Sequence, residues 1–85
     1  MPGHRTTHVS ITPGDSGEGA SNGEIPYNID YLWVGVGGDL ALEDKDGTAI
    51  TYSNVPSGTE VWGSFTRVND TNTDASNIVA VGSAF

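Results

Sequence analysis

Cysteine is absent from this chain of 85 residues. The protein therefore has neither disulfide bonds nor thiolate ligands for a structural metal. Because a domain of this size buries only a small part of its surface, the core alone stabilises it weakly. Association with further copies of the chain, or with another protein, is the remaining source of stability.

Positive charge is scarce: three Lys and Arg residues stand against eleven Asp and Glu residues, for a net charge of −8. Nucleic-acid binding is not expected, because phosphate backbones require a basic surface, and anionic membranes are disfavoured for the same reason. No stretch approaches the roughly 20 apolar residues of a membrane-spanning helix. The opening MPGHRTTHVS lacks the apolar centre of a secretory signal, so we expect synthesis in a cytoplasm.

Residue groupings that carry catalysis or hold metals are missing too. No G-x-S-x-G elbow occurs. His4 and His8 would lie about 13 Å apart on a strand, too far for one metal ion. The turn at Asp44, Asp46 and Gly47 lacks the remaining ligands and the helical flanks of a calcium loop. We therefore predict no catalytic residue, no metal ligand and no cofactor, and we do not expect an enzyme.

Glycine, threonine and serine are abundant, and the composition is typical of short strands joined by tight turns. Twelve of the residues are glycine, and helix-forming runs are few. The segments rich in β-branched or aromatic residues are 6–11, 31–36, 39–43, 48–53, 60–68 and 78–82. Six short strands at this spacing predict one all-β domain over residues 1–85, an antiparallel β-sandwich or barrel.

Turn-forming residues separate these segments. Gly35, Gly37 and Gly38 lack the full dinucleotide fingerprint, and alternating residues follow them, which predicts a hairpin turn or a bulge between strands 31–36 and 39–43. Asp46-Gly47 and Pro56 to Gly58 predict two further turns.

The long segment at about 13–29 has few bulky side chains, and residues 13–28 of it read PGDSGEGASNGEIPYN. It is either a flexible loop or an arm that a neighbouring molecule orders. The first eleven residues are then a candidate edge strand that could pair with another subunit.

Aromatic residues mark the candidate interaction surface. Tyr31 and Trp33 alternate with Leu32, Val34 and Val36, so both faces of strand 31–36 are apolar. In a sheet this small, a partner subunit is expected to cover the second face. The predicted interface residues are Tyr31, Trp33, Trp62, Phe65 and Phe85. An alternative is a carbohydrate-binding platform formed by Trp33, Trp62 and Tyr52.

The order of motifs along the chain resembles a known family. In sequence these motifs are ITPGDS (11–16), YLWVGVGGDLAL (31–42), DG (46–47), VPSGTEV (55–61), TRVNDTNTDAS (66–76) and IVAVG (78–82). Together they resemble the small head spike base proteins of tailed phages and gene transfer agents. The order and spacing of the motifs carry the resemblance, because no single motif is specific.

The resemblance implies an all-β structural protein of the virion, made in the host cytoplasm and placed on the outer surface of the head. Such a protein supports a spike or fibre. Because the core is weak and apolar residues are in surplus on strand 31–36, we expect a homo-oligomer, a trimer or a pentamer, that binds the major capsid protein. A capsid decoration (cement) protein that clamps adjacent capsomers is the alternative within this class. In such an oligomer, Arg5 and Arg67 would be available to offset carboxylates across the interface.

Overall fold

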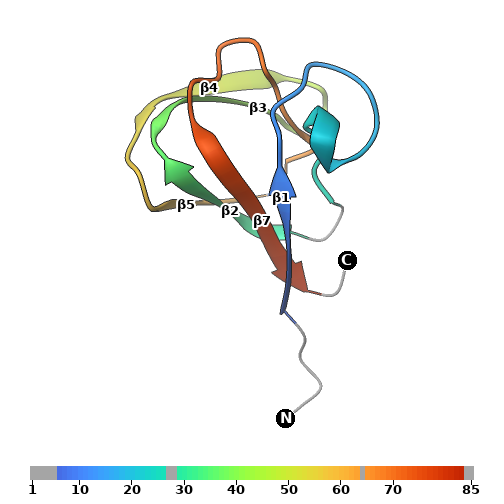
Figure 1. Cartoon of the computed structure of the whole chain (residues 1–85). Coiled ribbons are helices and arrows are strands. Elements are labelled where there is room, and N and C mark those ends of the chain that lie inside the picture. The colour runs from blue at the N-terminus through green and yellow to red at the C-terminus, as the bar shows by residue number, and fades with distance from the viewer. Residues whose placement is uncertain (1–5, 27–28, 64, 84–85) are drawn as a thin grey trace.

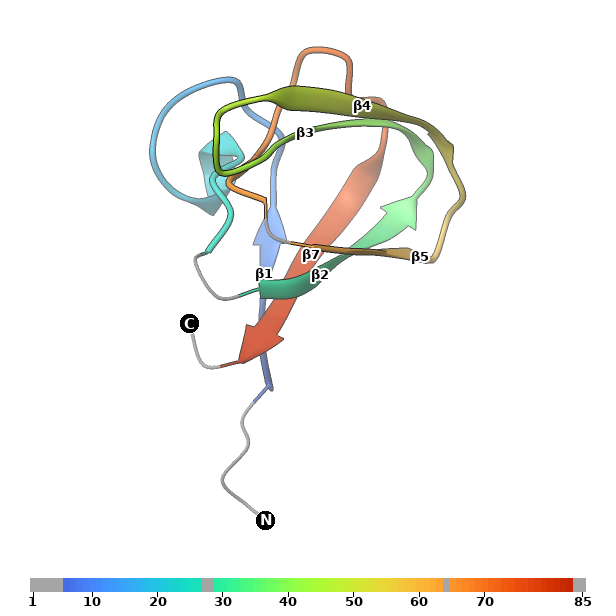
Figure 2. The ribbon, with the colours of Figure 1, turned by 180° about the vertical axis from the view of Figure 1, so that it is seen from behind.

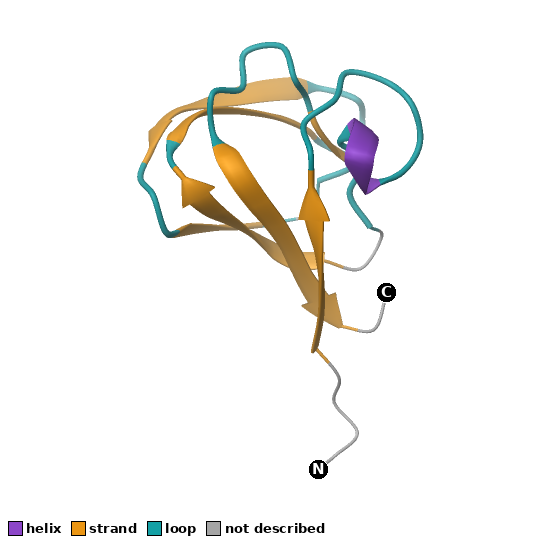
Figure 3. Cartoon of the chain, in the orientation of Figure 1, coloured by secondary structure: helices purple, strands orange, loops and turns teal. Residues whose placement is uncertain are grey.

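The computed structural model of the chain describes residues 6–26, 29–63 and 65–83, which form strands and one short helix (Figure 1; Figure 3). The elements are β1 (Thr6–Ile11), the 3-10 helix η1 (Ala20–Asn22), β2 (Ile29–Val36), β3 (Gly38–Glu43), β4 (Ala49–Val55), β5 (Thr59–Trp62), β6 (Arg67–Val68) and β7 (Ser76–Ser83). Among the described residues, no helix has the length and apolar character that a membrane crossing requires.

The strands form two antiparallel sheets that enclose one core. The first sheet has the order β1-β7-β2-β5, and the second has the order β4-β3-β6. Seen from behind, β3 and β4 form the upper layer, and β1, β7, β2 and β5 form the lower one (Figure 2). The predicted all-β antiparallel domain is therefore confirmed, as a sandwich of four and three strands.

Alternating side chains from the central strands fill the core between the sheets. Leu32 and Val34 of β2 are fully buried, as are Leu40 of β3 and Ile78 and Ala80 of β7. This alternation is the period of two that strands impose on side-chain direction. Of the two apolar faces of β2, the one with Leu32 and Val34 points into the core, whereas Val36 at the end of the strand is 46% exposed.

The predicted hairpin between 31–36 and 39–43 is wrong, because β2 and β3 belong to different sheets. β2 pairs with β5 and β7, whereas β3 pairs with β4 and β6. At the crossing, a Cβ on Gly37 would overlap the carbonyl oxygen of Val55, and Gly38 has a φ of 150°. A flat hairpin would leave the apolar side chains of both strands on one open face. Crossing between the layers buries them against each other.

The segment 60–68 is not one strand, so the expected six strands become seven in the described residues. β5 ends at Trp62 in the first sheet, and β6 begins at Arg67 in the second. Gly63 has a φ of 145°, which favours glycine and lets the chain leave the first sheet at this point.

The hairpin that does form joins β3 to β4 at the predicted Asp46-Gly47 turn. The Asp44 carboxylate accepts hydrogen bonds from the backbone amides of Asp46 and Thr48, at 2.8 and 3.1 Å. Gly47 has a φ of 83°. This side-chain bond within the turn is the reason that Asp and Asn begin such turns. The Pro56 turn also forms, and it carries the chain from β4 to β5 in the other sheet.

The loop between β1 and β2 folds against its own chain. The Arg67 guanidinium donates to the backbone carbonyls of Asn22, Gly17 and Gly14, at 2.5, 2.7 and 3.4 Å. Ile25 of the same segment is buried in the core. The described part of this segment, residues 13–26, therefore contacts the rest of its own chain.

Candidate functional site: an aromatic surface on the first sheet

The outer side of the four-stranded sheet carries a continuous group of aromatic and aliphatic side chains. Tyr31 lies opposite Trp62 on one neighbouring strand and opposite Val81 on the other, and Trp33 lies opposite Val79. Directly opposite residues of antiparallel strands point to the same face. We call these five residues the aromatic face.

Two rings of the aromatic face are in contact, and both of its tryptophans are open to solvent. The centroids of the Tyr31 and Trp62 rings lie 4.7 Å apart, with an angle of 35° between the ring planes. Trp33 is 39% exposed and Trp62 is 64% exposed. Large aromatic side chains that are grouped and exposed are typical of surfaces that another molecule covers.

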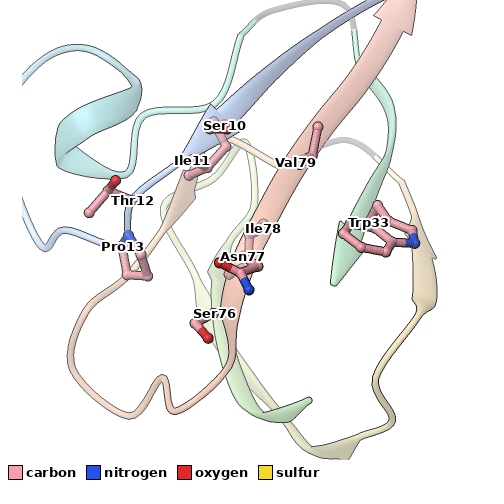
Figure 4. A pocket seen from close by; sticks show the side chains of 9 residues that line it. All are labelled: Ser10, Ile11, Thr12, Pro13, Trp33, Ser76, Asn77, Ile78 and Val79. Carbon is pink, nitrogen blue, oxygen red and sulfur yellow. The ribbon is translucent and has the colours of Figure 1, made fainter. Parts of the chain in front are cut away.

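A hollow of about 330 Å³ lies beside Trp33 (Figure 4). Residues 10–13 and 76–79 line it together with the indole ring, which forms one wall. Gly35 makes room for that ring, because a Cβ at this position would lie 2.8 Å from Cζ3 of Trp33. The face is therefore not flat: a recess large enough for one bulky side chain or one sugar ring adjoins the tryptophan.

Polar groups border the aromatic face. Glu60 lies opposite Trp33, and its carboxylate accepts a hydrogen bond of 3.2 Å from the indole nitrogen of Trp62. His8 and Ser10 of β1 lie opposite Val81 and Val79, and both are exposed. An apolar centre with a polar border is the usual arrangement of a protein interface.

The structure divides the residues that the sequence predicted for the interface. Tyr31, Trp33 and Trp62 come together, but Phe65 lies elsewhere, half-buried against the core. Its ring meets that of Tyr52 edge to face at 6.4 Å. Phe85 lies outside the described residues.

The predicted platform of Trp33, Trp62 and Tyr52 does not form. Tyr52 is on β4 of the second sheet, whereas both tryptophans are on the outer side of the first. Arg67, which was expected to offset carboxylates across an interface, bonds through its guanidinium to carbonyls of its own chain. Arg5 lies outside the described residues.

A second exposed apolar group lies on β4, and its most exposed residue, Ile50, was not among the predicted interface residues. Ile50 is 51% exposed and Tyr52 is 39% exposed. The segment 49–55 contains no charged residue, although the chain is strongly acidic. The absence of charge over 49–55 was the signal in the sequence for a contact surface on this strand. Only the structure shows that β4 lies at the edge of its sheet.

The titratable groups of the described residues form no recognisable reaction centre. No three His, Asp or Glu side chains of this part of the chain are grouped to hold a metal ion. The pKa of Asp15 is held below its ordinary value, chiefly by hydrogen bonds from the backbone amide and hydroxyl of Thr71. The carboxylate also accepts from the amide of Asp70, so it joins the β1–β2 loop to the segment before β7. This is a structural contact.

Comparison with known proteins gives one informative relative. No protein-family model matches the chain, and no curated protein does either. A chain from the solved capsid of a native gene transfer agent (GTA) particle, computed with C5 symmetry, shares the fold with a TM-score of 0.68. The two sequences are 33% identical, and the match covers 92% of this chain and 81% of the other. The chain thus belongs to the family of this capsid-particle protein and is a virion structural protein of the phage and gene transfer agent type.

Proposed function

We propose that the protein is a non-enzymatic component of the outer head surface, where a homo-oligomer binds the major capsid protein and forms the base of a spike or fibre. The observation that carries this proposal is the aromatic face. An 85-residue domain gains little stability from its core, yet it leaves two tryptophans and their apolar neighbours in water.

Covering the aromatic face by a partner would be strongly favourable. Aromatic side chains of this size bury about 150 to 250 Å² each, and each Å² of apolar surface removed from water contributes about 25 cal/mol. Tryptophan and tyrosine are also the residues that most often dominate the binding energy of protein interfaces. The hollow beside Trp33 is suited to receive one bulky apolar side chain of the partner.

A ring is the form of oligomer that we expect. The particle that contains the relative was computed with C5 symmetry. A pentamer on a five-fold axis of the head would be compatible with this symmetry. A homo-oligomeric base at a five-fold vertex would present identical sites to one spike or fibre.

The position of the protein on purified particles tests the proposal. We expect mass spectrometry to find the chain in intact particles, and we expect cryo-electron microscopy to place its density on the outside of the head at the five-fold vertices. Density at three-fold or quasi-three-fold positions would instead support the decoration protein, because that is where adjacent capsomers meet. Absence from intact particles would contradict both.

Carbohydrate binding is the second candidate, and the hollow beside Trp33 is the observation that favours it. An indole wall with the hydroxyls of Ser10 and Ser76 and the amide of Asn77 is a combination that suits a sugar ring. Titration with neutral oligosaccharides should then shift tryptophan fluorescence, and Trp33→Ala should abolish the shift. An unchanged spectrum at millimolar sugar would eliminate this candidate.

A further inference from the structure

The exposed large apolar side chains of the described residues gather on two separate surfaces. Apart from Val36 at the end of β2, they lie on the aromatic face or on β4. Ile50 lies opposite Leu42, and Tyr52 lies opposite Leu40, so both point to the same side as these core leucines. They remain exposed because β4 is an edge strand with no further strand beside it.

Phe65 joins the second surface through its edge-to-face contact with Tyr52. We call Ile50, Tyr52 and Phe65 the β4 patch. It lies at the edge of the second sheet, whereas the aromatic face lies on the outer side of the first. The two surfaces differ in shape, in composition and in the sheet that carries them.

Two dissimilar surfaces are what a cyclic trimer or pentamer requires. In such a ring each copy contacts its two neighbours through different patches, whereas a two-fold dimer pairs one patch with itself. This step rests on the homo-oligomer proposed above. A chain that associated only through one self-complementary surface could dimerise but could not close a ring.

Charge disfavours pairing of the aromatic face with itself. Each copy carries Glu60 beside Trp33, so such a contact would place two carboxylates, one from each copy, within one partly desolvated interface, where like charges repel. The described cations are poorly placed to offset this, because Arg67 bonds to loop carbonyls and Lys45 stands between Asp44 and Asp46. The strand β4 carries no charged residue, so a contact between the aromatic face and β4 avoids the repulsion.

We propose that neighbouring copies join head to tail, with the aromatic face of one copy packed on the β4 patch of the next. Tyr31, Trp33 and Trp62 then form one half of the interface between subunits, and Ile50, Tyr52 and Phe65 form the other. The aromatic face and the β4 patch lie apart within one chain, so both are available for contacts with neighbouring copies.

Mixing two variants tests this arrangement. Trp62→Asp removes the aromatic face, and Ile50→Asp removes the β4 patch, each at a side chain that is more than half exposed. Alone, each variant should fail to form the ring at concentrations about 100-fold above the wild-type requirement, as expected for an unpaired charge at the centre of an interface. Mixed in equal amounts, they retain one intact pair of surfaces and should form a 1:1 heterodimer and nothing larger.

Thr51→Asp is the matched control, because it adds the same charge on the same strand but on the opposite face. It should assemble as the wild type does. Sedimentation velocity and native mass spectrometry identify the species, and circular dichroism verifies folding. If an aspartate variant does not fold, Trp62→Ser or Ile50→Ser replaces it.

Three results would overturn the head-to-tail arrangement while the wild type still assembles: a mixture that stays monomeric, a stable dimer of Ile50→Asp alone, or an Ile50→Asp ring of normal size. A wild-type chain that is folded and monomeric at its highest soluble concentration would be a different result. It would contradict the homo-oligomer itself.

Discussion

At the scale of single residues, two charged side chains hold the long loop before β2 in place. The Arg67 guanidinium bonds to three backbone carbonyls of the loop, and Asp15 accepts three hydrogen bonds from Asp70 and Thr71. Hydrogen bonds to an ionised carboxylate favour its charged form, which is why the pKa of Asp15 is lowered. Of these two sets of contacts, the one at Asp15 is strongest while its carboxyl group is ionised, whereas the Arg67 contacts do not depend on that ionisation.

This predicts a defined pH dependence. The pKa of Asp15 is lower in the folded state than in the unfolded chain, where it is about 4. The ionised carboxylate therefore contributes fully to the free energy of unfolding at pH values above the unfolded pKa. This contribution is lost as the pH falls through the lower pKa that Asp15 has in the folded protein. Asp15→Asn should be less stable than the wild type at pH 7 and should lose less stability on acidification. Urea unfolding from pH 7 to pH 2.5 measures both slopes.

Thr71→Val gives an independent check by NMR titration of the Asp15 carboxyl group. The variant removes the hydroxyl donor and should move the pKa of Asp15 upward, toward its ordinary value. A carboxyl group that titrates at its ordinary value in the wild type would contradict this account of the loop.

At the scale of the elements, the glycine between β2 and β3 determines how the two sheets are joined. The amide of Gly37 donates to the hydroxyl of Ser57 at 2.8 Å, and the turn after β4 passes directly over it. No side chain fits between these two backbones. The crossing therefore depends on close backbone contact, which is one of the reasons for glycine inside an apolar strand pattern.

Gly37→Ala should accordingly destabilise the fold by about 3 kcal/mol, the upper end of the usual cost of overpacking. The obstacle is the backbone of Val55, which cannot move aside as a flexible side chain would. Gly47→Ala is the matched comparison, since that position has a positive φ but open space around it, and about 1 kcal/mol is expected. Chemical denaturation of both variants gives the difference. Equal losses would mean that the crossing tolerates a side chain.

At the scale of the whole molecule, the protein combines a small core with a large exposed apolar surface and a net charge of −8. The core requires support, and the aromatic face offers a surface through which to obtain it. The negative charge opposes open-ended aggregation, because all copies of the chain repel one another. The apolar contacts attract two copies only when the matching surfaces face each other. A closed oligomer satisfies both conditions.

Trp33→Asp should dissociate this oligomer without unfolding the chain. Burying an unpaired carboxylate at the centre of an interface costs several kcal/mol, about 3 to 5 in typical cases. Glu18→Lys, on the exposed loop, should leave assembly nearly unchanged. Sedimentation equilibrium of the three proteins makes the comparison. If Trp33→Asp only unfolds a monomeric protein, Trp33 acts within its own chain and the aromatic face is not the interface.

The sequence by itself determined the features that depend on neighbouring residues. Alternation placed Leu32 and Val34 on one side of β2 and Tyr31 and Trp33 on the other, and Asp46-Gly47 placed the hairpin turn. These signals are local, because side-chain direction alternates with each residue and turn chemistry lies within a few positions. The class of fold and the first half of the candidate surface follow from them.

Only the tertiary structure decided which strands share a sheet. β1 pairs with β7 from the other end of the chain, and the adjacent strands β2 and β3 do not pair at all. Strand pairing depends on the total apolar surface that the two layers bury, and no single segment carries that information. The same applies to Ile50: its pattern is that of any strand, and its exposure arises because β4 has a neighbour on one side only.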